Sequence, residues 1–160
     1  MKSVLISIKP KWVEKIASGE KTIEVRKTAP KEVPFKAYIY CTKGKDGYEW
    51  LYRVDNNGYG KAQSWHGKVI GEFICDKAER FSVGSLRSDD IEKLACLSYN
   101  DIINYFYKPE ELDGKTAKQG FAWHISDLKI YDKPKELNEF DRPCPIENKD
   151  CENCIRYGKP

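Results

Sequence analysis

The chain has 160 residues, which is enough for one domain with a buried core and too few for two ordinary domains. Charged residues make up 33% of the chain and apolar ones 40%, a composition that excludes both a disordered chain and a typical membrane protein. Lys9 and Pro10 interrupt the first apolar run too early for a secretory signal, so we expect a cytoplasmic protein with no membrane partner.

The charge is distributed unevenly along the chain. The net charge is only +3, but residues 1–45 contain eleven basic residues against four acidic ones, a balance of +7. The remaining residues therefore carry a balance of −4. Two interpretations remain open, a surface for an anionic partner or lysines that only keep the protein soluble.

The first elements are predicted to be a strand and an amphipathic helix. The short apolar run at residues 3–8 predicts a buried strand. Pro10 suits the first turn of a helix, and the apolar spacing after it predicts one buried stripe. Gly19 predicts a left-handed helix end.

Residues 22–26 form the most informative pattern of the chain, because polar and apolar residues alternate there. A strand over this segment buries Ile23 and Val25 on one face. The other face then carries a polar row about 13 Å long. The residues of that row are Thr22, Glu24 and Arg26.

The rest of the chain predicts a mixed order of elements. We expect strands at 37–41, 69–75 and 121–130, helices that begin near 88 and 98, and a hairpin excursion or long surface loop at 43–67. Ser98 and Asp101 match a helix-capping pattern. This order favours an α+β fold with a largely antiparallel, closed sheet.

The polar row has two interpretations. A guanidinium offers a planar fork to a phosphate or a base edge, and a carboxylate accepts from an exocyclic amine, so Glu24 and Arg26 suit a nucleobase with its backbone. Lys9, beside the start of the first helix, would hold a phosphate there. The alternatives are an ordinary ion pair on a solvated sheet and an ordinary exposed lysine.

The residues around this corner resemble the ASCH domain. The resemblance rests on a Gly-x-Lys-x-x-Glu-x-Arg motif after the first helix, here Gly19, Lys21, Glu24 and Arg26. Segments 38–43, 67–73 and 122–126 are also similar to the small ASCH proteins of bacteria and phages. The resemblance implies a PUA-like, mostly antiparallel β-barrel with flanking helices at residues 1–140, with the motif lining a cleft.

A binding function follows from this resemblance. It implies RNA, a nucleoside or a nucleotide as partner, held by the charged residues Lys9, Lys21, Glu24 and Arg26. Aromatic rings stack on bases, which makes Tyr40, Trp65 and Trp123 candidates for the pocket. Trp123 is equally a core residue, and Trp65 is equally a lid or a plug of the fold.

Hydrolysis is the alternative function that the resemblance implies. Members similar to acetylcytidine amidohydrolases use a Lys and a Thr nucleophile in the motif with a Glu further on, and other members act as ribonucleases. This chain keeps Lys21 but has Glu24 where that Thr would stand. A hydrolase would then use Lys21 as base, Glu24 to orient it or activate water, Thr22 as a displaced hydroxyl, and Glu72 as second carboxylate.

The six cysteines fall into two groups. Cys41, Cys75 and Cys96 lie in apolar segments and predict reduced core thiols. The tail, residues 141–160, contains Cys144, Cys151 and Cys154, whose spacing suits zinc but supplies no fourth ligand. We therefore expect no cofactor and free tail thiols, with zinc as the alternative. A protein-binding adaptor that uses this tail is a third functional hypothesis.

Overall fold

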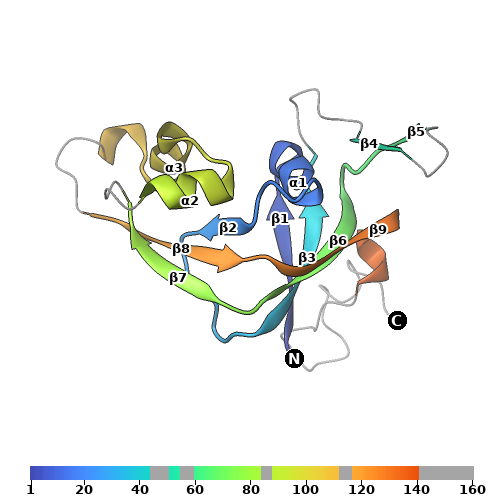
Figure 1. Ribbon diagram of the computed structural model, residues 1–160, viewed down its shortest axis with the longest axis horizontal. Coiled ribbons are helices and arrows are strands. Elements are labelled where there is room, and N and C mark those ends of the chain that lie inside the picture. Colours follow the sequence, from blue (N-terminus) through green and yellow to red (C-terminus); the bar gives the residue numbers. More distant parts are fainter. Residues whose placement is uncertain (44–50, 55–59, 84–87, 112–116, 141–160) are drawn as a thin grey trace, which may run out of the picture.

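A computed structural model of the chain describes residues 1–43, 51–54, 60–83, 88–111 and 117–140 (Figure 1). The strands are β1 (Ser3–Ile8), β2 (Ile23–Arg26), β3 (Phe35–Cys41), β4 (Leu51–Val54), β5 (Gly60–Gln63), β6 (Lys68–Cys75), β7 (Ala78–Ser82), β8 (Gln119–His124) and β9 (Ser126–Glu136). The helices are α1 (Pro10–Ala17), α2 (Ser88–Ala95), α3 (Tyr99–Phe106) and the short 3-10 helices η1 (Pro109–Glu111) and η2 (Leu137–Glu139). The fold is α+β, as the sequence predicts.

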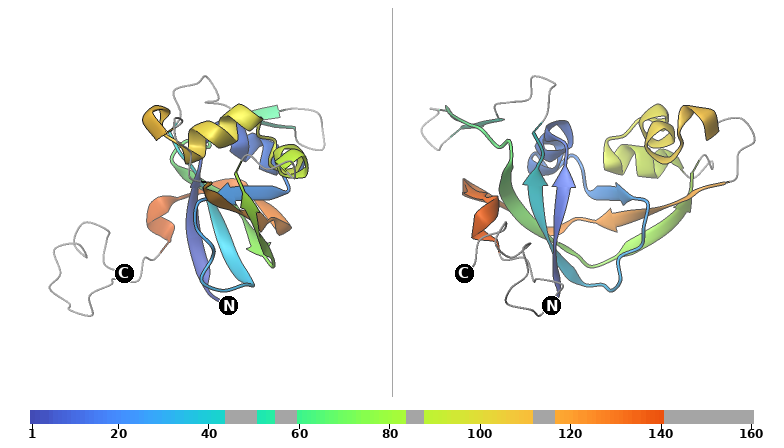
Figure 2. Two further views of the ribbon diagram at one scale, coloured as in Figure 1. Left: turned by 90° about the vertical axis from the view of Figure 1, so that its left-hand side faces the viewer. Right: turned by 180° about the vertical axis from the view of Figure 1, so that it is seen from behind.

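The described strands form two main sheets. One has the order β1-β3-β6-β9 and the other the order β2-β8-β7, while β4 and β5 pair as a separate hairpin. Only β1 and β3 run parallel among these pairs. Helix α1 lies over the first sheet, and α2 and α3 lie over the second (Figures 1 and 2).

Two bent stretches of chain serve both sheets. Strand β6 continues into β7 across residues 76–77, and β8 continues into β9 across Ile125. β6 pairs with β9 in the first sheet, and β7 pairs with β8 in the second. Just after the second bend, Asp127 has a φ of 48°, a left-handed conformation. Bends of this kind let a strand change sheets at a corner.

Three expectations from the sequence are corrected here. The single strand expected over 121–130 is two strands in two sheets, because the chain turns at Ile125. Strand β7 was not expected at all. The expected closed barrel is not observed among the described strands, since β1 and β2 share no backbone ladder. A side-chain contact joins them instead, in which Arg26 Nη2 donates to the carbonyl of Ser7 at 3.2 Å.

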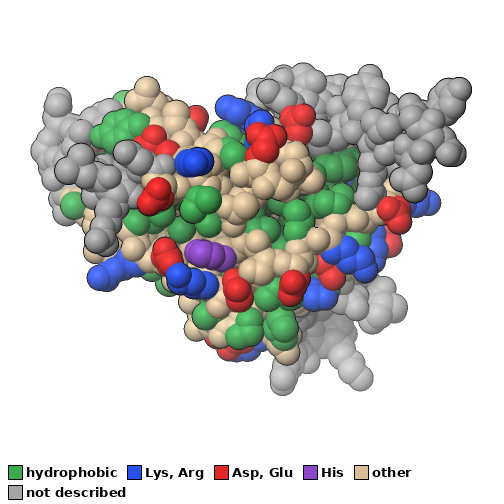
Figure 3. Space-filling view, in the orientation of Figure 1, with side chains coloured by type: hydrophobic (Ala, Val, Ile, Leu, Met, Phe, Trp, Pro, Cys, Tyr) green, Lys and Arg blue, Asp and Glu red, His purple; other side chains and the backbone are tan. Residues whose placement is uncertain are grey.

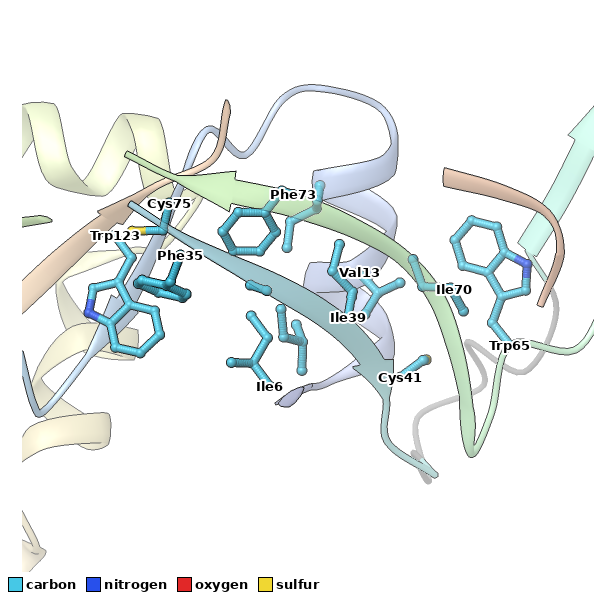
Figure 4. Close-up of a cluster of buried hydrophobic side chains, with 13 residues drawn as sticks. Ile6, Val13, Phe35, Ile39, Cys41, Trp65, Ile70, Phe73, Cys75 and Trp123 are labelled. Carbon is cyan, nitrogen blue, oxygen red and sulfur yellow. The ribbon is translucent and has the colours of Figure 1, made fainter. Parts of the chain in front are cut away.

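Each main sheet has its own apolar core. The first is built under α1, where Val13 and Ile16 pack on Ile39 and Phe73 (Figure 4). The second lies under α2 and α3 and includes Ile23, Val25, Ile102 and Phe106. The apolar face predicted for residues 22–26 is therefore confirmed.

Local signals of the sequence account for several element ends. Gly19 ends α1 with a φ of +78°, as predicted. Ser98 caps α3: its side chain accepts from the backbone of Asp101, whose carboxylate accepts from the backbone of Ser98. The excursion expected at 43–67 contains the β4–β5 hairpin. No described helix is long and apolar enough to cross a membrane.

Candidate functional site

Lys21 is buried where β2 begins and α2 ends. Its side chain is 2% exposed, and its ammonium donates to the carbonyl of Ala95, the last residue of α2, at 2.9 Å. It also lies 3.3 Å from Glu24 Oε2. The backbone supports this junction, because the N–H of Thr22 donates to the carbonyl of Leu94. Burial lowers the pKa of Lys21, and the nearby Glu24 carboxylate opposes that shift.

Glu24 connects Lys21 to Arg26. Its Oε1 lies 3.1 Å from Arg26 Nη2, so one carboxylate is shared by two cations. Lys21, Glu24 and Arg26, which we call the ionic triad, carry a net charge of +1. The Arg26 side chain is 23% exposed and is the most accessible member of the triad. Its Nε–H is buried and has no hydrogen-bond partner among the described residues.

The triad is not the open polar row that the alternation predicts. Glu24 is only 9% exposed, because cross-strand pairing sets it beside Trp123 of β8, on the face turned toward the first core. Thr22 is exposed, and its carbonyl accepts from the N–H of Ile125. Of the three residues in the predicted polar row, Arg26 alone is both a member of the ionic triad and partly accessible to solvent.

The start of α1 brings more cations near α3. Lys9 is exposed and occupies the N-cap of α1, where its side chain makes no capping bond. The pKa of Asp101 in α3 is lowered chiefly by Ser98, and Lys11 and Lys9 add to the shift. The first turns of α1 and α3 are therefore close enough to interact electrostatically. Between these helical groups, above β2, the molecular surface dips (Figure 3).

Aromatic side chains surround the ionic triad. Trp12 of α1 lies under the ammonium of Lys11 at 4.4 Å and 5.8 Å from that of Lys21. Trp123 lies 5.9 Å from the Arg26 guanidinium and donates through its indole N–H to the carbonyl of Thr28 at 3.3 Å.

Tyr105 of α3 stands at the other side of β2. It is 42% exposed. Lys27 Nζ lies over the Tyr105 ring at 5.0 Å. Burial raises the pKa of the Tyr105 hydroxyl, and Arg26 partly opposes this rise. Tyr105 is thus an accessible ring within electrostatic range of the triad.

The structure does not bring all the candidate aromatic residues together. Trp65 and Trp123 are both buried, and they lie at opposite ends of the first core (Figure 4). Tyr40 alternates with the buried Ile39 along β3, so it lies on the sheet face away from α1. Of the three rings, Trp123 alone contacts the ionic triad.

Glu72 lies apart from the motif. Its carboxylate accepts from Tyr131 at 2.7 Å and pairs with Lys36 at 3.0 Å, on the same face of the first sheet as Tyr38. These contacts lower the pKa of Glu72. The geometry therefore gives Glu72 a structural ion pair rather than a place beside Lys21.

The described cysteines and acids form no metal site. Among the described residues, no group of three or more His, Cys, Asp and Glu side chains could hold a metal ion. Cys41 and Cys75 are buried free thiols, and burial raises their pKa values to about 12 and about 11. Cys96 is also free. The tail at 141–160, with its three cysteines, lies outside the described residues.

Sequence reasoning missed several groups at this site. The carbonyl of Ala95 and the ring of Tyr105 come from α2 and α3, more than seventy residues away from Lys21. The sequence points to these two groups only through the predicted helices that begin near residues 88 and 98. Trp12 belongs to the apolar residues after Pro10 that predict the buried stripe of α1, and Lys11 beside it is the local signal for the cation–aromatic contact.

A separate hollow lies elsewhere on the molecule. It is formed by Ser64, Lys68 and four residues near the end of β9 and in η2, and it shares no residue with the ionic triad. Lys68 and Glu136 form an ion pair across it. The motif and this hollow are distinct features of the surface.

Comparisons with known proteins identify the fold. No family model and no curated protein matches the sequence. The crystal structure of ASCH from Zymomonas mobilis is similar with a TM-score of 0.59 at 23% identity, over 86% of this chain and 76% of that chain. Two single-residue variants of that protein, tyrosine to phenylalanine and serine to alanine, match at 22% identity with TM-scores of 0.58 and 0.59. The resemblance drawn from the motif is thus confirmed in three dimensions, and the chain has the ASCH fold.

Proposed function

We propose that the protein binds a nucleoside or a short single-stranded segment of nucleic acid, RNA-related, at the dip between α1 and α3. The observation that carries the proposal is the ionic triad, whose most exposed member is the Arg26 side chain, held in place by Glu24. A guanidinium presents five N–H donors, so the accessible part of Arg26 can donate to an acceptor atom of a ligand. The ASCH fold supports RNA as the source of that ligand.

Arg26 and the residues around the triad have separate roles in this proposal. Arg26 contacts a phosphate or sugar oxygen, and Lys9 and Lys11 add positive charge at the start of α1. Tyr105, which is 42% exposed, offers a ring on which a base can stack.

Filter binding of a single-stranded RNA at several salt concentrations tests the proposal. Arg26→Gln is expected to weaken binding and to flatten the dependence of log affinity on log salt by about 0.7, the loss of one phosphate contact on a single strand. Lys36→Gln is the matched control. Lys36 is also paired with a glutamate, but it lies on the face of the first sheet that points away from α1. Unchanged affinity and slope in Arg26→Gln would defeat the proposal.

Hydrolysis is a second candidate, favoured by one observation. Burial lowers the pKa of Lys21 beside a carboxylate, which is what a lysine acting as a base requires. Acetylcytidine and RNA are incubated with the protein and with Lys21→Ala, and the products are separated by chromatography. Substrate loss with the wild type and Lys36→Ala, but not with Lys21→Ala, would support a hydrolase. No loss with any of the three proteins would exclude it for these substrates.

A further inference from the structure

Lys21, the lysine of the motif, is buried and its ammonium contacts other groups of the protein. The Lys21 side chain is 2% exposed, and its ammonium is held by the carbonyl of Ala95 and by Glu24. The C-terminal turn of a helix carries unpaired carbonyls and partial negative charge, so the end of α2 is a natural site for a cation. Both contacts of this ammonium are therefore made inside the protein.

The motif arginine has the opposite environment. Arg26 is fixed on one side, because Nη2 lies 3.1 Å from Glu24 Oε1 and donates to the carbonyl of Ser7 at 3.2 Å. Its Nε–H is left unpaired, and 23% of the side chain is exposed. A ligand can reach Arg26 but has almost no access to Lys21.

We propose that Lys21 is a positioning residue that sets the orientation of Arg26 through Glu24 and does not itself touch the ligand. Lys21 ties the Glu24 carboxylate to the end of α2, and that carboxylate holds the Arg26 guanidinium against β1. Arg26 then makes the only ionic contact of the triad, with one anionic oxygen such as that of a phosphodiester. This inference rests on the proposed binding function and divides the work within it.

Salt dependence separates a positioning lysine from a ligand-binding one. Loss of a phosphate contact lowers affinity and also flattens the salt slope, whereas loss of orientation lowers affinity with the slope unchanged. For Lys21→Met we expect RNA affinity to fall about tenfold, which is the scale of one charged hydrogen bond. The salt slope of this variant should equal that of the wild type. For Arg26→Gln we expect a similar loss of affinity, together with a salt slope about 0.7 smaller than that of the wild type.

A ligand-free measurement tests the same inference independently. The Nε–H proton of Arg26 is buried, so its NMR signal, assigned by its loss in Arg26→Gln, should exchange slowly with water. Lys21→Met and Glu24→Gln should both accelerate that exchange, while Lys36→Met should leave it unchanged. Glu24→Gln keeps the size of the side chain, which provides a second variant if Lys21→Met folds poorly.

The outcomes distinguish the two proposals. A wild-type protein that binds no RNA overturns the proposed function, and the exchange rates still decide whether Lys21 positions Arg26. A Lys21→Met slope reduced as much as that of Arg26→Gln would show that Lys21 contacts phosphate and would overturn the inference. So would an Arg26 Nε–H exchange rate that neither Lys21→Met nor Glu24→Gln changes.

Discussion

At the scale of single residues, Lys15 and Lys21 show how position decides the behaviour of one side-chain type. Lys15 of α1 pairs with Glu20 at 2.7 Å, and this hydrogen bond raises its pKa above the ordinary value of 10.5. Lys21 is buried, and desolvation lowers its pKa below that value. The two groups should therefore affect stability in opposite directions as the pH rises.

We predict that Lys21 makes stability rise with pH below 10.5. Between its lowered folded pKa and 10.5, the unfolded chain binds more protons at Lys21 than the folded protein does, so raising the pH favours folding. The free energy of unfolding of the wild type minus that of Lys21→Met should then increase between neutral pH and 10.5. Urea unfolding at a series of pH values measures this difference.

Lys15→Met is the matched control for this titration. The pKa of Lys15 is raised, so its contribution is fully present below 10.5 and is lost only as the pH rises beyond that value. The difference between the wild type and Lys15→Met should stay flat up to 10.5 and then fall. A flat difference for Lys21→Met as well would mean that burial does not destabilise the charged ammonium.

At the scale of elements, α3 depends on its first turn. Ser98 and Asp101 cap each other's backbone N–H groups, and the helix places Ile102 and Phe106 in the second core. We predict that Ser98→Ala lowers the free energy of unfolding by about 1 kcal/mol. Asn100→Ala, in the same exposed turn, is the control and should change stability less. Equal unfolding midpoints for the two variants would contradict the role of the cap.

Elements with a local signal could be predicted from the sequence, and those set by distant pairing could not. Gly19 and the Ser98–Asp101 pattern marked real helix ends because the turn and the cap are made by neighbouring residues. The break at Ile125 has no such mark, since it results from β8 and β9 pairing with different sheets. The motif itself was found, but the burial of Glu24 depends on the opposite strand.

At the scale of the whole molecule, two apolar cores share two bent stretches of chain. One core lies under α1 and the other under α2 and α3. β6 with β7, and β8 with β9, run from one sheet into the other, so each sheet has two strands that are directly continuous with strands of the other sheet. This connection argues that the two cores unfold together.

Tryptophan fluorescence can test that coupling, because Trp12, Trp65 and Trp123 all belong to or pack on the first core. We predict that Ile102→Val in the second core and Ile39→Val in the first each lower the free energy of unfolding by about 1 kcal/mol, and that both shift the same fluorescence transition. Far-UV circular dichroism should give coincident midpoints for each protein. If Ile102→Val moved the circular dichroism transition but left the fluorescence midpoint in place, the cores would unfold separately. The ionic triad would then lie on a boundary between two independent units, since Lys21 bonds to α2 while Arg26 bonds to β1.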